Sequence, residues 1–105
     1  MQWIPVCPVD DIDPEDLIRF DRRGKTYAIY RDPEGAVFAT DGLCTHEQVH
    51  LCNGLVIGNE IECPKHNGRL NYKTGEAMRL PCVTAIKTHP VRVAGTMIEI
   101  GLEEL

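Results

Sequence analysis

Cys44-Thr45-His46 and Cys63-Pro64-Lys65-His66 are two short stretches in which a histidine closely follows a cysteine, and residues 47–62 separate them. Each stretch is expected to lie in a loop next to a short strand. Thiolate sulfur is a soft metal ligand and imidazole nitrogen a borderline one, so two of each suit a cluster whose two irons need different ligands. The two stretches together therefore predict an iron–sulfur centre, whereas either one alone would predict little.

The composition is that of a small globular protein. The chain has 105 residues, of which 43% are hydrophobic and 26% charged, and its formal net charge is -5. An acidic chain without clustered Lys and Arg is a poor match for nucleic acid. Its first residues lack a basic stretch followed by an apolar run, and no window is long enough to span a bilayer. We expect one domain over residues 1–105, monomeric and cytoplasmic, with neither nucleic acid nor membrane as a partner.

The cysteine content also favours metal binding. Five cysteines accompany four histidines. An odd number of cysteines fits a secreted disulfide framework less well than metal ligation in a reducing compartment. At least one thiol must then remain outside any pairing within the chain.

Short strand-like segments fill the chain and predict an all-β sandwich or barrel. They are rich in apolar, β-branched or aromatic residues, and tight-turn sequences with Gly, Pro, Asn or Asp separate them. Only Asp13 to Leu17 offers a helical turn, with Pro14 at its first position. The expected strands are residues 3–6, 17–20, 26–30, 37–40, 55–57, 60–62, 70–72, 85–88, 91–94 and 97–100.

The segment between the two Cys/His stretches explains how they can meet. Residues 55–62 are typical of a hairpin that turns at Gly58-Asn59, so the chain runs out and back. Both stretches would then lie at the same end of the fold, in a cluster-binding part of about residues 42–82. Gly42, Gly54 and Gly68 would allow close backbone approach around the site.

These residues resemble the Rieske [2Fe-2S] family, whose motif is C-x-H followed, at a similar spacing, by C-x-x-H. Leu80-Pro81 looks like the proline-bearing third loop that covers the cluster in that family. The resemblance implies an antiparallel β-sandwich with a small cluster-binding subdomain of two loops and a hairpin. It also implies that Cys44 and Cys63 bind one iron and that His46 and His66 bind the other.

Within that family, the chain is most similar to the soluble ferredoxins of bacterial aromatic-ring-hydroxylating dioxygenase systems. Membrane-complex Rieske proteins carry a disulfide between the two loops, and Val49 and Lys65 stand at the corresponding positions here. The lack of that disulfide favours the low end of the class range of about -150 to +300 mV. The resemblance implies a one-electron carrier that receives electrons from an NAD(P)H-dependent flavin reductase and passes them to a terminal Rieske non-haem iron oxygenase. The chain is too short to hold a second, mononuclear iron site as well, so we expect it to catalyse no reaction itself.

Other interpretations remain open from the sequence. The four residues could hold a structural zinc ion in an interaction module, although zinc sites usually begin with a C-x2-4-C pair. The chain could also be a Rieske-like small subunit of a larger reductase, such as a nitrite reductase. We expect His50 to be a polar loop residue, and Cys52 and Cys82 to be free thiols, with a bridge between those two cysteines as the alternative.

Overall fold

The computed structural model describes residues 1–104, which form short antiparallel strands and two single turns of 3-10 helix. This confirms the expected all-β class. The turns are η1 (Val9–Asp11) and η2 (Leu51–Asn53). The strands are β1 (Gln2–Pro8), β2 (Asp16–Arg22), β3 (Lys25–Arg31), β4 (Val37–Asp41), β5 (Leu55–Ile57), β6 (Glu60–Glu62), β7 (Arg69–Asn71), β8 (Ala77–Arg79), β9 (Thr88–His89), β10 (Val91–Ala94) and β11 (Met97–Leu102).

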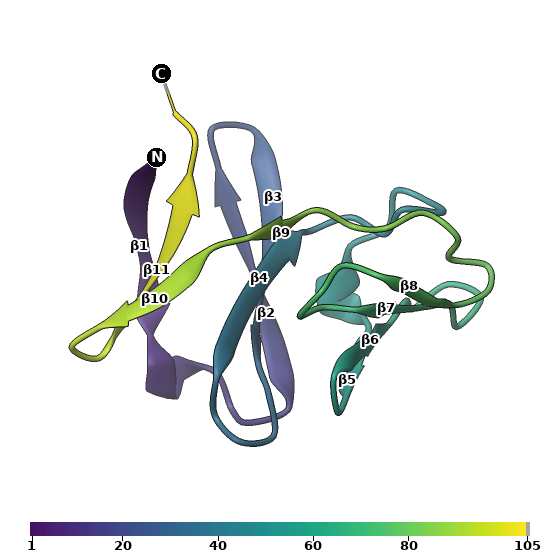
Figure 1. The fold of residues 1–105 in the computed structure, drawn as a ribbon, viewed down its shortest axis with the longest axis horizontal. Coiled ribbons are helices and arrows are strands. Elements are labelled where there is room, and N and C mark those ends of the chain that lie inside the picture. The colour runs from purple at the N-terminus through teal and green to yellow at the C-terminus, as the bar shows by residue number, and fades with distance from the viewer. Residues whose placement is uncertain (105) are drawn as a thin grey trace.

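The strands form three sheets, ordered β1-β11-β10, β2-β3-β4-β9 and β5-β6-β7-β8. The first two sheets enclose a core of mainly aliphatic side chains, including Ile29, Ile98 and Ile100, none of which is exposed to solvent. The third sheet lies beside the second, on the side away from the first (Figure 1). The expected β-sandwich is therefore present, and the third sheet forms a small subdomain next to it.

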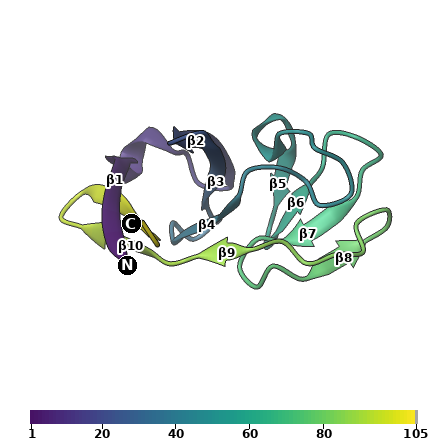
Figure 2. The same cartoon turned by 90° about the horizontal axis from the view of Figure 1, so that it is seen from above.

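The third sheet is an insertion between β4 and β9. These two strands pair antiparallel, with Thr40 opposite Thr88 and Ala39 opposite His89. The chain thus leaves the second sheet after Asp41 and re-enters the same sheet edge at Thr88. Both views show β9 beside β4, with β5 to β8 on the far side of this junction (Figures 1 and 2). Residues 42–87 therefore form an inserted segment, and this segment contains both Cys/His stretches.

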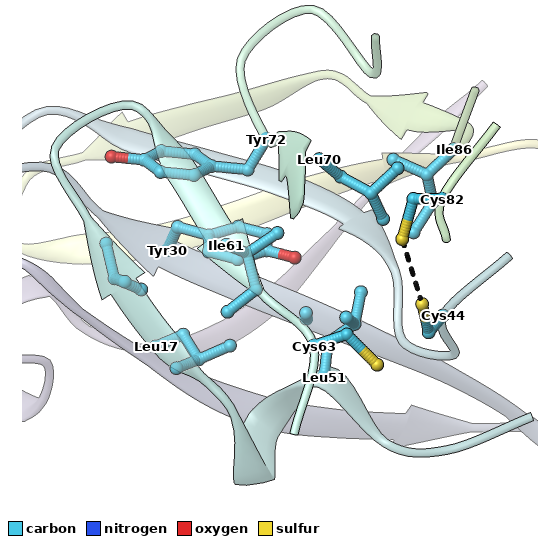
Figure 3. Close-up of a cluster of buried hydrophobic side chains, with 12 residues drawn as sticks. Leu17, Tyr30, Cys44, Leu51, Ile61, Cys63, Leu70, Tyr72, Cys82 and Ile86 are labelled. Carbon is cyan, nitrogen blue, oxygen red and sulfur yellow. Dashed lines mark hydrogen bonds between the residues drawn. The ribbon is translucent and has the colours of Figure 1, made fainter. Parts of the chain in front are cut away.

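A second core fixes the third sheet to the sandwich. The rings of Tyr30 in β3 and Tyr72 after β7 stack with centroids 4.5 Å apart, and neither residue is exposed. The Tyr30 hydroxyl is 2.8 Å from the Thr40 hydroxyl, so its polar end is satisfied. Ile61 and Leu70, on β6 and β7, are also fully buried in this core (Figure 3). Because aromatic rings bury large apolar areas, this contact holds the subdomain firmly.

Three expectations about individual elements were wrong. The helical turn lies at Val9–Asp11 instead of Asp13–Leu17, because Glu15 adopts a left-handed backbone (φ 59°) that ends any helix. Strand β8 was missed, since Ala-Met-Arg carries no β-branched residue. The strand expected at residues 85–88 is reduced to β9, because Ile86 is buried in a loop where its N–H bonds to Gly75.

A partly buried ion pair also links the subdomain to the sandwich. The Asp32 carboxylate accepts hydrogen bonds from Lys73 Nζ at 2.8 Å and from the Ala36 N–H at 2.8 Å. Lys73 is the main cause that holds the pKa of Asp32 below its usual range, and the backbone N–H groups of Ala36 and Glu34 add to it. A lowered folded-state pKa adds stability above the unfolded-state pKa of about 3.9, and this stability is lost as the pH falls through the folded-state pKa.

We therefore expect Asp32→Asn to lower the free energy of unfolding at pH 7 by about 1.5–3 kcal/mol, the range for hydrogen bonds to charged groups. The difference from the parent protein should shrink as the pH falls below about 4. Urea unfolding at pH 7 and at low pH measures both effects. Asp10→Asn is the control, since the Asp10 side chain is 97% exposed. Equal destabilisation by the two substitutions would contradict the assignment.

Candidate metal centre

The first loop begins where β4 ends and folds back on itself. The Leu51 N–H donates to the Gly42 carbonyl and the Cys44 N–H to the Val49 carbonyl, both at 2.9 Å. Leu43 and His50 form an isolated antiparallel bridge within the loop. These bonds bury Cys44 to 3% exposure and fix the backbone on both sides of His46.

The second loop is a tight turn between β6 and β7. The Cys63 N–H donates to the Gly68 carbonyl at 2.7 Å, which closes the turn. His66 and Asn67 both have left-handed backbones, with φ of 65° and 57°. This turn buries Cys63 at its base and leaves the His66 side chain 62% exposed at its tip. The Lys65 N–H donates to the Cys63 thiol, a contact that suits a thiolate.

The structure places the four predicted residues in one region, but of the four only Cys44 and His46 belong to the group whose donor atoms all lie within 4.8 Å of one another. Cys44 Sγ is 2.9 Å from His46 Nδ1, and the Cys63 thiol contacts the Cys44 thiol. The rings of His46 and His66 have centroids 6.0 Å apart. The predicted hairpin is present, with Leu55 of β5 opposite Glu62 of β6. The hairpin thus joins the two loops as expected.

The two histidines differ in exposure. His66 lies largely in solvent, whereas His46 is half-buried and its Nε2 is buried without a hydrogen-bond partner in the described chain. Of the two rings, only that of His66 is therefore largely exposed to solvent. His46 lies beside the third loop, where its Nδ1 is 3.7 Å from Cys82 Sγ.

Polar side chains tie the loops to one another, a feature the sequence did not predict. Lys65 Nζ of the second loop forms an ion pair with Glu47 Oε2 of the first loop at 3.0 Å. This contact is the main cause that lowers the pKa of Glu47. Thr45 donates from its hydroxyl to the carbonyl of Thr84 at 2.8 Å. The first loop is thereby held against both the second loop and the third.

Cys82 was missed as a site residue. Its Sγ lies 3.6 Å from Cys44 Sγ, and the two residues are 3% exposed each (Figure 3). All five cysteines are free in the described part of the chain, so the alternative bridge between Cys52 and Cys82 does not form. The position of Cys82 directly after Pro81, in the expected third loop, was the one signal in the sequence.

Burial keeps two of these thiols protonated at neutral pH in the absence of a metal. Desolvation, with smaller effects from Cys44, raises the pKa of Cys63 to about 11 and that of Cys82 to about 12. For Cys63 the Lys65 N–H acts in the opposite direction. A metal bound here must displace the thiol protons.

The sequence model of the Rieske [2Fe-2S] domain matches residues 2–90. The chain belongs to the Rieske [2Fe-2S] family. Its cofactor is accordingly a [2Fe-2S] cluster, and the Cys/His group at the meeting point of the loops offers thiol and imidazole donors suited to it.

Relatives of similar length are ferredoxins. The ferredoxin component of the naphthalene 1,2-dioxygenase/salicylate 5-hydroxylase systems of Ralstonia sp is 39% identical over 101 residues, 96% of each chain. The ferredoxin component of the naphthalene 1,2-dioxygenase system of Pseudomonas putida is 38% identical over 102 residues, 97% of each chain.

Solved structures that are similar to this chain also include ferredoxins. The Sphingomonas yanoikuyae B1 ferredoxin superposes with a TM-score of 0.90 at 32% identity, covering 97% of this chain and 100% of that one. A chain in the complex of reduced oxygenase and oxidised ferredoxin of carbazole 1,9a-dioxygenase gives 0.89 at 31% identity, covering 96% and 97%. A putative nitrite reductase small subunit from Mycobacterium tuberculosis gives 0.86 at 16% identity and covers 99% and 97%, which shows the shared fold alone. Within residues 1–104 there is no helix of the length and apolarity that crossing a membrane requires.

Gly54 shows how closely the first loop packs on the hairpin. A Cβ at this position would lie 2.1 Å from the Glu62 carbonyl oxygen, a backbone atom of β6 next to Cys63. We expect Gly54→Ala to push the two loops apart, to lower the free energy of unfolding by about 1–3 kcal/mol as overpacking does, and to reduce the cluster content of purified protein.

Iron and sulfide analysis together with thermal unfolding checks this. The control is Asn53→Ala, next in the chain and exposed. A Gly54→Ala protein with the parent's iron content and stability would show that the loops do not depend on this contact.

Proposed function

We propose that the protein is a one-electron carrier that receives electrons from an NAD(P)H-dependent flavin reductase and delivers them to a terminal Rieske non-haem iron oxygenase. Its relatives are ferredoxin components of aromatic dioxygenase systems over nearly their whole length. The observation that carries the proposal is the meeting of two Cys/His loops with one histidine, His66, at an exposed tip. This geometry suits electron transfer to a docked partner.

Within this proposal, Cys44 and Cys63 would hold one iron and His46 and His66 the other. The cysteines are buried and His66 is exposed, so the thiolates would bind from the side of the core. When bound, such a cluster accepts and releases one electron, and neutral imidazoles make its reduction easier than with four thiolates. The Lys65 N–H on Cys63 would stabilise the thiolate charge.

The side chain that we assign as the exit for electrons is His66. Its exposed ring can touch a partner directly, whereas His46 lies beside Cys82 and its Nε2 is buried. Ligand atoms carry part of the redox orbital, so the exposed ligand shortens the path to an acceptor.

An apolar rim beside the site would receive the partner. We use this name for Met78, Leu80 and Val83, which flank Pro81 of the third loop and are 45%, 74% and 72% exposed. Of the charges nearby, Lys65 is paired with Glu47, whereas Arg79, between Met78 and Leu80, is exposed. Exposed apolar side chains at one place mark an interaction surface. Docking of the oxygenase would therefore depend on apolar contact at this rim, with Arg79 beside it.

The two alternatives gain no support. The zinc-module interpretation predicts relatives that are structural zinc proteins, whereas the relatives at 38–39% identity are ferredoxin components. The nitrite reductase small subunit shares only the fold at 16% identity.

Electron transfer in a reconstituted system tests the function directly. Reduced protein mixed with candidate oxygenases should reoxidise at a rate that rises with oxygenase concentration, and a flavin reductase with NAD(P)H should re-reduce it. A protein that carries the cluster and yet exchanges electrons with no reductase and no oxygenase of aromatic-ring-hydroxylating systems would contradict the proposal.

The apolar rim makes a separate prediction. Leu80→Asp should slow electron transfer to the oxygenase about tenfold or more at subsaturating concentration, the loss expected for a central apolar contact. The reduction potential should stay unchanged. Val93→Asp is the matched control, because Val93 is 45% exposed on β10 in the first sheet, far from the site (Figure 1). Equal losses in the two variants would point to a general effect of charge.

His66 can be tested by its reduction potential. His66→Cys replaces a neutral ligand by a thiolate, and the added negative charge should lower the potential and slow turnover. His50→Cys is the control, since His50 lies in the first loop outside the proposed ligand set and should leave the potential unchanged. Protein-film voltammetry measures both. A His66→Cys protein that contains the cluster at the parent potential would refute the ligand assignment.

A further inference from the structure

Three donor atoms lie at distances close to those expected around a single metal ion, a smaller site than a two-iron cluster requires. They are Cys44 Sγ, His46 Nδ1 and Cys82 Sγ, and all three lie within 4.8 Å of one another. Cys44 Sγ is 2.9 Å from His46 Nδ1 and 3.6 Å from Cys82 Sγ, and Cys82 Sγ is 3.7 Å from His46 Nδ1. Cys82 has no place in the cluster ligand set proposed above.

These separations can be compared with those around one tetrahedral zinc ion. Zn–S bonds of about 2.3 Å and Zn–N bonds of about 2.0–2.1 Å place two sulfurs roughly 3.8 Å apart and a sulfur and a nitrogen roughly 3.5 Å apart. The two distances that involve Cys82 agree with these values within about 0.2 Å. Only the contact between Cys44 and His46 must widen, by about 0.6 Å. A cluster instead requires these two residues on different irons.

A fourth thiol lies beside this group, although its sulfur is outside the set of atoms that all lie within 4.8 Å of one another. It belongs to Cys63, which is within hydrogen-bond reach of the Cys44 thiol. Cys63 and Cys82 are 1% and 3% exposed. Figure 3 shows the sulfur atoms of Cys44, Cys63 and Cys82 at the same end of the buried side-chain cluster. Three thiols and one imidazole, shielded from water, form a donor set typical of closed structural zinc sites.

We propose that the protein, when it lacks its cluster, binds one Zn2+ through Cys44, His46, Cys82 and Cys63. Cys82 takes the place that His66 has in the cluster ligand set, because His66 lies at an exposed, left-handed turn. Each thiol that binds zinc releases its proton to solvent, and no oxidation state changes. Zinc and the [2Fe-2S] cluster then exclude each other, since both need Cys44, His46 and Cys63. The proposal shares those three residues with the proposed function and does not depend on any electron-transfer partner.

The test uses the full chain purified from iron-limited, zinc-supplemented cells. The colourless fraction should contain close to one zinc per chain. In competition with a chromophoric chelator, Cys82→Ser should lose about 100-fold or more in zinc affinity, at least the upper range seen when groups around a metal are removed. Cys52→Ser is the control, because Cys52 is not one of the four proposed ligands and its thiol lies 3.9 Å from Asn53 Oδ1. His66→Ala should bind zinc like the parent and assemble no cluster.

Several results would overturn the proposal. The first is a colourless parent fraction without zinc, including one in which Cys44 and Cys82 are joined by a disulfide. The second is a zinc affinity that is unchanged in Cys82→Ser, or that is weakened equally in Cys52→Ser. The third is a His66→Ala protein that does not bind zinc. Folding of Cys82→Ser is checked separately, because the iron-loaded variant should show the cluster EPR signal of the parent. That signal in the parent also separates a failure of the zinc site from a failure of the proposed cluster ligands.

Discussion

The pairing of β5 with β6 is the constraint on which the metal centre depends. Leu55 opposite Glu62 places the end of the first loop beside the start of the second, and Gly54 lets the two backbones approach closely. Without this pairing, Cys44 and Cys63 would be separated by a flexible segment. The stack of Tyr30 on Tyr72 then fixes the hairpin to the sandwich, so the loops are positioned by a rigid base. The site is thus built on a short hairpin that could not be stable alone.

Much of this arrangement was predictable because it depends on local signals. The turn at Gly58-Asn59 and the apolar and β-branched strand residues act over a few residues, and the two Cys/His stretches lie within residues 44–66. The role of Cys82 was not predictable, since it depends on how the third loop packs over Cys44, a contact between residues far apart in sequence. Ile86 misled for a related reason: its apolar side chain is buried by a loop, so an apolar run was mistaken for a strand.

The difference between His46 and His66 also arises from tertiary packing. Thr45 bonds to Thr84 and draws the first loop against the third, which covers His46. The second loop turns outward through two left-handed residues and leaves His66 in solvent. Two histidines that look equivalent in the sequence therefore occupy different environments. The exposed one lies in the outward turn of the second loop, and the covered one lies beside Cys82, where two metal sites would compete for the same donors.

Pulsed EPR of the dithionite-reduced protein, with histidine labelled with nitrogen-15, tests the central claim most directly. If the two loops supply the cluster ligands, couplings from two histidine nitrogens should appear; His66→Cys should leave one of them and Cys82→Ser should leave both. Coupling from only one histidine in the parent, or from none, would contradict the account.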